Sequence, residues 1–382
     1  MMPTPKNHEG ILSRVPVYRL AAVATIQAVL LCGCNSNSRV EPPRNTQSVV
    51  LAAADSQPSS SLMESLDASQ LGIDFNHQWK PRDRHQALLL KTGFTGGGVC
   101  MGDYDGDGWT DVLLTRPHGG LQLYRNSGEF RFENSTSAAG VSCEESWTTG
   151  AAMVDLNRDH QLDLVVCTYD GPNLVFINQG QGTFREMGAE TGLNFRGASV
   201  KMAWADFDND GDLDGYLTTN RLEPKTEVKV KYLGGPGNYT VAPEHVEHVG
   251  IINLPGGEQK FYKAGQADHL FKNLLAETGE LRFADVTKEA QLDGYYHGLD
   301  VTWWDANGDG WPDIYVANDF TDPDQFYLNK GDGTFIDTTR RALPSTPWFT
   351  MGAAFADLNR DGMIEGTDLD LLTTAFGDSV QP

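Results

Sequence analysis

The feature that most constrains this chain is a nine-residue acidic phrase that recurs five times. The copies read DYDGDGWTD, DLNRDHQLD, DFDNDGDLD, DANGDGWPD and DLNRDGMIE. They occupy residues 103–111, 155–163, 206–214, 305–313 and 357–365, which we call loops 1 to 5. Successive copies begin 52, 51, 99 and 52 residues apart. Because the third interval equals one repeat plus about 47 further residues, we expect a tandem array with one insertion.

Other short sequence features recur with the same spacing as the acidic phrase. A small, Gly-containing stretch such as TGGGVCMG precedes each copy, and a short apolar stretch such as DVLLT follows each of the first four. An aromatic segment that ends in Asn comes next, as in LYRN and VFIN, and a Gly turn with a Phe closes the unit. Four short strands in a period of about 50 residues are typical of a propeller blade. One such sheet cannot bury both of its faces alone, so neighbouring units must pack together.

We therefore predict an all-β fold, a β-propeller-like array of four-stranded blades with four complete repeats and the start of a fifth. Strand A of each blade should end at the acidic loop, and strand B should begin just after it. The long insertion lies within residues 221–267. The predicted domains are a lipoprotein signal peptide at 1–33, a flexible tether at 34–65, the repeats at 66–356, and a calcium loop with its C-terminal end at 357–382.

The acidic loops have the ligand pattern of a calcium site. Calcium takes about six to eight oxygens in irregular geometry, and each loop offers Asp, Asn or Glu at positions 1, 3, 5 and 9. Position 6 is Gly in four loops, which supplies a bend with positive φ. His160 holds that position in loop 2, so we expect loop 2 to be the weakest site. The predicted ligands are Asp103, Asp105, Asp107, Asp111, Asp155, Asn157, Asp159, Asp163, Asp206, Asp208, Asp210, Asp214, Asp305, Asn307, Asp309, Asp313, Asp357, Asn359, Asp361 and Glu365.

The number of charges in the loops also favours a metal. The ligand positions hold 17 of the 52 acidic residues, and carboxylates that lie so close repel one another without a cation. Magnesium demands stricter octahedral geometry, and zinc or copper prefers His and Cys ligands. Calcium is therefore the predicted cofactor, with up to five sites. The alternative is a set of solvated Asp–Gly turns that hold no metal.

Loop 5 continues differently from the others, as DLNRDGMIEGTDLDLLTTAFGD. Over twelve positions it resembles an EF-hand-like half of a dockerin, in which Asp368 supplies the last ligand and a short helix follows. The alternative closes the loop at Glu365 and makes the following LDLLTT a strand. Calcium is common to both interpretations.

The N-terminus reads as an export signal. Lys6, Arg14 and Arg19 precede an apolar run, and that run ends in LCGC, which resembles a bacterial lipobox with lipid on Cys34. Ordinary secretion and a plain N-terminal anchor helix are the alternatives. Three further cysteines, Cys100, Cys143 and Cys167, allow either one disulfide with one thiol or three buried thiols.

The net charge excludes some partners. Removal of residues 1–33 takes away three basic groups and one acid, so the net charge changes from −23 to −25. Such a chain repels nucleic acid and anionic lipid headgroups and suits multivalent cations instead.

Taken together, these marks resemble a known family. The phrase D-x-D-G-D-G-x-x-D, in phase with a Gly-rich start and an L-Y-x-N tail, resembles the FG-GAP/VCBS repeat of integrin-α-like β-propellers. The phrase FADVTKEAQL and the long insertion are similar to bacterial secreted proteins of the cartilage-acidic-protein type, which often carry a UnbV/ASPIC module. The resemblance implies calcium in the strand A–B loops and extracellular binding or adhesion rather than catalysis.

The chain also departs from that family. Seven blades of 52 residues would need about 364 residues, so we expect either an open array or a truncated one. The sequence contains no GxSxG, no HExxH and no phosphate loop. We therefore expect a non-enzymatic, exported, calcium-binding envelope protein that binds an extracellular protein or glycan and attaches to the membrane through its lipid. The alternatives are a hydrolase built on a propeller scaffold and a purely architectural or truncated envelope protein.

Overall fold

The structure is a computed structural model that describes residues 17–20, 63–77, 80–81, 83–92, 96–222, 228–254, 256–292, 294–319, 322–343, 346 and 350–355. The chain divides into two compact units, Met1–Asp74 and Phe75–Pro382. In the first unit, strand β1 (Val17–Leu20) pairs antiparallel with β2 (Met63–Leu66), and the 3-10 helix η1 (Ala68–Leu71) follows. The predicted signal, lipid site Cys34 and tether lie outside the described residues, except for parts of these strands.

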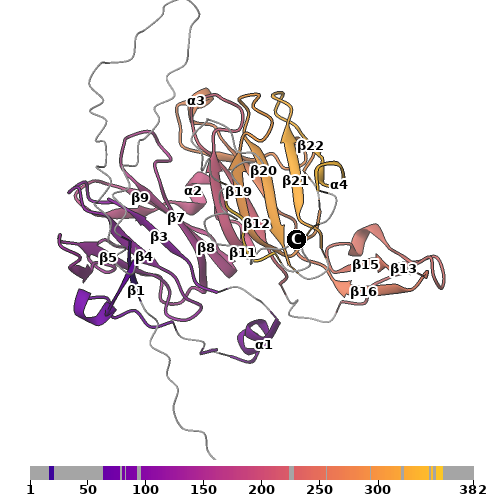
Figure 1. The fold of residues 1–382 in the computed structure, drawn as a ribbon, viewed down its shortest axis with the longest axis horizontal. Helices are drawn as coiled ribbons and strands as arrows, with labels where there is room; N and C mark the ends of the chain where they lie inside the picture. The colour runs from indigo at the N-terminus through magenta and orange to yellow at the C-terminus, as the bar shows by residue number, and fades with distance from the viewer. Residues whose placement is uncertain are drawn as a thin grey trace, which may run out of the picture. The chain divides into compact units, whose positions relative to one another are not determined.

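Four blades, each of four antiparallel strands, make up most of the described part of the second unit (Figure 1). Blade 1 contains β3 (Val99–Gly102), β4 (Asp111–Leu114), β5 (Gln122–Asn126) and β6 (Phe132–Asn134). Blade 2 contains β7 (Thr148–Val154), β8 (Asp163–Pro172), β9 (Leu174–Asn178) and β10 (Phe184–Glu186). Blade 3 contains β11 (Arg196–Ala205), β12 (Asp214–Thr219), β17 (His269–Asn273) and β18 (Phe283–Asp285). Blade 4 contains β19 (Gly298–Trp304), β20 (Asp313–Asn318), β21 (Gln325–Asn329) and β22 (Phe335–Asp337).

The predicted all-β array with four complete blades is thus confirmed. In each blade the acidic loop joins the first two strands, as the sequence predicts. The first strands β3, β7, β11 and β19 contact one another in chain order, so successive blades stand side by side. Loop 5, which would begin the fifth blade, lies outside the described residues.

Blades 2 and 3 are joined more closely than separate sheets would be. Strands β8 and β11 are each 10 residues long, and their far ends pair antiparallel, with Ala198 opposite Tyr169. The two blades therefore form one continuous eight-stranded sheet. The repeat pattern did not predict the pairing of β8 with β11. The acidic loops show where the second strand of each blade begins, but the sequence shows less clearly where that strand ends.

Apolar side chains fill the spaces between successive blades. Leu113 of blade 1 packs with Leu164 and Phe176 of blade 2, and all three are buried. A second cluster joins blades 2 and 3, and a third joins blades 3 and 4. Full burial of one such side chain stabilises the fold by roughly 1.5–3 kcal/mol. This arrangement explains why strands such as β12 are buried along their whole length and show no alternation.

The insertion forms two small hairpins between β12 and β17 (Figure 1). Strand β13 (Tyr232–Leu233) pairs with β14 (Thr240–Val241), and β15 (Val249–Asn253) pairs with β16 (Gln259–Lys263). The 3-10 helix η2 (Pro243–His245) lies between them.

The helices of the second unit are short: α1 (Arg84–Thr92), α2 (Gly188–Thr191), α3 (Leu275–Thr278) and α4 (Thr339–Ala342). Within the described ranges, no helix has the length and apolar character needed to cross a membrane. The three cysteines of the repeats are free thiols, but only Cys167 among them is buried, so the prediction of three buried thiols holds in part.

In blades 2, 3 and 4, the Asn that ends the third strand forms a hydrogen bond with the preceding blade. Asn178 Nδ2 donates to the carbonyl of Tyr104, at 2.9 Å, and Asn273 Nδ2 donates to the carbonyl of Leu156, at 3.1 Å. Asn329 Nδ2 donates in the same way to the carbonyl of Phe207. Each acceptor is position 2 of the preceding acidic loop. The recurring Asn therefore sets the register between blades.

Asn126 provides a matched control for this role. Its Nδ2 donates to Thr110 O within blade 1, and its Oδ1 accepts from Gly128 N. We expect Asn273→Ala to lower the free energy of unfolding by about 1–3 kcal/mol more than Asn126→Ala, because only the former leaves a buried carbonyl of another blade without a donor. Urea denaturation of both variants measures the difference. Equal losses would show that the inter-blade bond does not stabilise the array.

Candidate metal-binding loops

The first Asp of each acidic loop organises the loop backbone. In loop 1, Asp103 Oδ1 accepts from Gly106 N at 2.8 Å and from Asp107 N, and its Oδ2 accepts from Gly108 N at 2.8 Å. Position 1 of the other three described loops accepts from the amide of position 6 in the same way, at 2.9, 2.9 and 2.7 Å. Side chains at positions 1, 3 and 5 therefore gather around one short turn.

The backbone bends as the sequence predicts. Position 6 has positive φ in all four described loops, and the angle is 67° at His160 and 88° at Gly108. The prediction that His160 adopts this conformation is confirmed. Position 4 is also left-handed, including the non-Gly residues Arg158 and Asn209, and the sequence analysis did not anticipate that. Asn tolerates this conformation better than most side chains do, so loop 3 is less strained there than loop 2.

The carboxylate at position 9 is buried and bound by backbone amides. Asp163 is fully buried; its Oδ2 accepts from Leu156 N at 3.0 Å and its Oδ1 from Asn178 N at 2.8 Å. Asp111, Asp214 and Asp313 repeat both contacts in their own blades. Burial raises the pKa of Asp163 to about 6 and that of Asp214 to about 8. Position 9 therefore joins the loop to the third strand of its blade, whether or not it also contacts a metal.

Two of the loops bring three carboxylates together. One oxygen each from Asp103, Asp105 and Asp111 lie within 4.8 Å of one another in loop 1. The same holds in loop 3 for Asp206, Asp208 and Asp210. The predicted ligands Asp107 and Asp214 lie outside these two groups. Loops 2 and 4 have Asn at position 3 and contribute no such three-acid group among the described residues.

The donor set of loop 3 fits a hard cation. Asp208 Oδ1, Asp210 Oδ2 and Asp212 Oδ1 are buried and accept no hydrogen bond from the described residues. Buried carboxylate oxygens without donors are costly, and a divalent ion would satisfy all three. Sequence analysis missed Asp212, which stands at position 7, and Glu277, which helix α3 adds to an Asp210–Asp212–Glu277 group. Two signals were available: position 7 is acidic in loop 3 but Trp or Gln in loops 1, 2 and 4, and the β17–β18 connection of this repeat is longer.

In loops 2 and 4, the amide of the Asn at position 3 contacts the neighbouring carboxylate. Asn157 Nδ2 lies 3.0 Å from Asp159 Oδ2, and Asn307 Nδ2 lies 2.9 Å from Asp309 Oδ2. Rotation of either amide would present its oxygen to the loop centre instead. The remaining predicted ligands lie outside the described residues: Asp357, Asn359, Asp361, Glu365 and Asp368.

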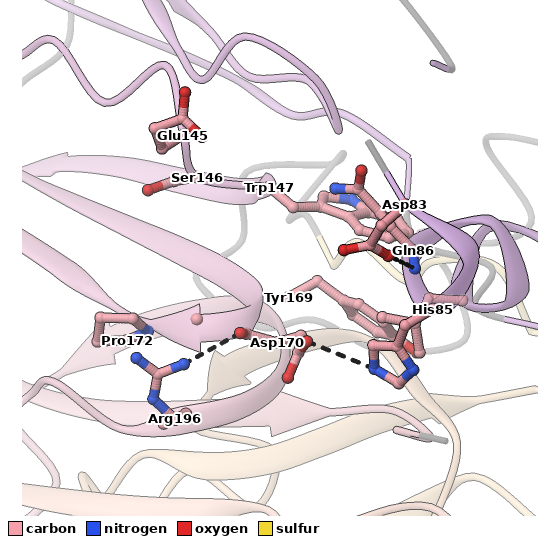
Figure 2. A pocket seen from close by; sticks show the side chains of 12 residues that line it. Asp83, His85, Gln86, Glu145, Ser146, Trp147, Tyr169, Asp170, Pro172 and Arg196 are labelled. Carbon is pink, nitrogen blue, oxygen red and sulfur yellow. Dashed lines mark hydrogen bonds and ion pairs between the residues drawn. The ribbon is translucent and has the colours of Figure 1, made fainter. Parts of the chain in front are cut away.

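A pocket lies at the other end of β8, away from the acidic loops (Figure 2). It has a volume of about 300 Å³ and is lined by residues of α1 and of the C-terminal end of β8, among others. His85 Nε2 lies 3.5 Å from Asp170 Oδ2, and Arg196 donates to the Asp170 carbonyl at 3.2 Å. The Trp147 indole Nε1 is buried and donates no hydrogen bond to the described residues. The sequence analysis did not anticipate this pocket, because its residues come from distant segments.

Comparisons with known proteins agree with this architecture. Residues 103–166, 161–216 and 305–365 match the FG-GAP-like repeat. Human cartilage acidic protein 1 is 22% identical over 266 residues, which are 68% of this chain and 34% of that protein. The mouse protein of the same name is 21% identical over 263 residues, with the same two shares. The chain thus spans about a third of the length of these relatives.

A solved structure also shows similarity, although its TM-score is only 0.28. It is described as the structural basis of specific recognition of non-reducing terminal N-acetylglucosamine by an Agrocybe aegerita lectin. Its sequence is 18% identical, and the match covers 64% of this chain and 65% of that one.

Proposed function

We propose that this chain, which carries FG-GAP-like repeats on a propeller-type β fold, is a non-enzymatic calcium-binding protein of the cell envelope that binds an extracellular partner. The observation that carries the calcium proposal is the group of buried oxygens on Asp208, Asp210 and Asp212 that accept no hydrogen bond from the described residues, although Lys272 Nζ lies 3.4 Å from the Asp210 oxygen. Positions 1, 3 and 5 of each loop would hold the ion. Bound calcium would neutralise the carboxylates and so stabilise the junctions between blades.

The insertion offers a surface for a protein partner. Three aromatic rings meet there: the Tyr232 and Phe261 centroids are 4.9 Å apart, and Tyr239 lies 5.8 Å from Phe261. Tyr232 is 40% exposed and Phe261 is 45% exposed. Exposed aromatic side chains that gather from two hairpins are typical of protein-binding sites. We therefore place the partner contact on this cluster, Tyr232–Tyr239–Phe261.

A glycan is the second candidate ligand, and the pocket beside α1 favours it. The pocket combines carboxylate, guanidinium and imidazole groups with the unused indole N–H of Trp147. Sugars present many hydroxyl groups that such donors and acceptors can bind. A hydrolase built on this scaffold and a purely architectural role remain the alternative functions.

Pull-down from an extracellular fraction tests the proposal, with calcium or EGTA present. We expect a partner to be retained in calcium and lost after Phe261→Ser. Lys330→Met changes an exposed residue of blade 4, away from the insertion, and this variant should still bind the partner. A partner captured equally by Phe261→Ser would exclude the aromatic cluster as the binding site, and inhibition by free glycans would favour the pocket.

Turnover of glycoside or ester substrates would contradict the non-enzymatic assignment. Labelling of Cys34 with a lipid analogue tests the proposed anchor.

A further inference from the structure

One residue position varies together with the acidic loops. The side chain just before the recurring Asn is basic in blades 1 and 3 and aliphatic in blades 2 and 4. The four residues are Arg125, Ile177, Lys272 and Leu328. Position 3 of the corresponding loops is Asp105, Asn157, Asp208 and Asn307. A basic side chain therefore occurs exclusively, among these four blades, where the loop carries the additional carboxylate.

The basic side chains contact that additional carboxylate directly. Arg125 pairs through Nε with Asp105 Oδ2 and through a terminal nitrogen with Asp107 Oδ2. Lys272 Nζ pairs with Asp208 Oδ2 and lies 3.4 Å from Asp210 Oδ2. In blades 2 and 4, the Asn amides at position 3 make the corresponding contact with position 5.

Each basic side chain offsets the additional carboxylate at position 3 of its loop. Loops 1 and 3 carry four carboxylates at positions 1, 3, 5 and 9, and loops 2 and 4 carry three. When Arg125 and Lys272 are included, each of these four-position sets has a charge of −3, and Asp212 at position 7 adds one further negative charge to loop 3. Lys272 Nζ also lies 2.5 Å from Glu277 Oε1, so Lys272 contacts a larger group of acidic side chains than Arg125 does. Its side chain is 22% exposed, against 39% for Arg125, so solvent screens its ion pairs less.

We infer that Arg125 and Lys272 are built-in counter-ions, which stabilise loops 1 and 3 without calcium and compete with calcium for the same carboxylates. This inference rests on the proposed calcium function. Calcium at loops 1 and 3 must separate these ion pairs. Calcium at loops 2 and 4 requires the rotation of an amide, which breaks the neutral hydrogen bond that each Asn oxygen accepts from the position 5 amide but separates no ion pair. Loops 2 and 4 therefore fill at lower calcium concentration, which reverses the order expected from His160 alone.

Lys272→Met tests the competition directly. Native mass spectrometry of the full chain, over a series of free calcium concentrations, counts the bound ions. We expect one ion of the variant to bind at calcium concentrations on the order of tenfold lower than in the wild type, because a positive charge no longer opposes it. In EGTA, the same variant should melt at a lower temperature than the wild type, because its carboxylates lose their counter-ion. Arg125→Met should show both effects, to a smaller extent.

The converse variant is Leu328→Lys, which adds a positive charge beside loop 4 and should weaken the binding of one ion. Lys330→Met and Arg131→Met are the matched controls, because their exposed ion pairs with Asp332 and Glu129 lie outside the acidic loops. Neither control should move the calcium midpoints.

The outcomes separate the inference from the proposed function. Calcium binding with unchanged midpoints in Lys272→Met, Arg125→Met and Leu328→Lys would overturn the inference alone. Absence of calcium binding from the wild type and all variants would overturn the proposed function, and the competition with it. Lower midpoints together with a lower melting temperature in EGTA would support the inference.

Discussion

We expect the removal of calcium with EGTA to lower the melting temperature of this protein by more than about 10 °C. A ligand at about 100 times its dissociation constant stabilises the folded state by about 2.7 kcal/mol per site, and four described loops act in one array. A change of 1 kcal/mol moves the melting temperature of a domain of 150–250 residues by about 2–4 °C. A thermal scan by circular dichroism, in calcium and in EGTA, measures the shift.

The physical reason is electrostatic. Without a divalent ion, several carboxylates lie close together around each turn, and their repulsion is offset only by local amides and by Arg125 and Lys272. Calcium restored after EGTA should return the melting temperature to its starting value, whereas magnesium should restore it poorly, because the loop geometry is irregular. A melting curve that does not respond to chelation would end the metal assignment.

Asp163→Ala and Asp159→Ala should destabilise the protein in different ways. Asp163 is fully buried and accepts from two backbone amides, so Asp163→Ala leaves both amides without an acceptor and should cost about 3–5 kcal/mol. Asp159 is exposed and accepts from the nearby Gln161 N at 2.8 Å. Asp159→Ala should therefore reduce the stabilisation by calcium and leave the stability in EGTA nearly unchanged.

Urea denaturation of both variants, in calcium and in EGTA, distinguishes the two roles. The loss from Asp163→Ala should persist in EGTA, because it arises from the junction between the loop and strand β9. If that loss disappears in EGTA, position 9 acts mainly as a metal ligand, and its hydrogen bonds contribute little. If Asp159→Ala loses the same stability with and without calcium, position 5 does not bind the ion.

The sequence alone determined the number of blades, the position of each acidic loop and the backbone bend at position 6. These features depend on short segments: a nine-residue turn closed by its own first Asp, a left-handed residue such as Gly108, and an apolar strand directly after it. Local chemistry of this kind repeats with the phrase. These local features can therefore be predicted from the repeated sequence. The same comparison of repeats identified His160 as the one non-Gly residue at position 6.

Only the tertiary structure decided what joins these units. The bond from Asn329 to Phe207 spans 122 residues and joins blade 4 to blade 3. The ion pair of Lys272 with Asp208 lies within blade 3, but it spans 64 residues because the insertion separates the two segments. Neither contact can be predicted from the spacing of the repeats. A repeat of fixed period shows which residues each unit contains, but not which side chains come into contact in the folded protein. The pairing of β8 with β11 likewise depends on how far two strands extend beyond their blades. The contacts between blades form because packing apolar faces between blades brings polar groups of different repeats within hydrogen-bonding distance.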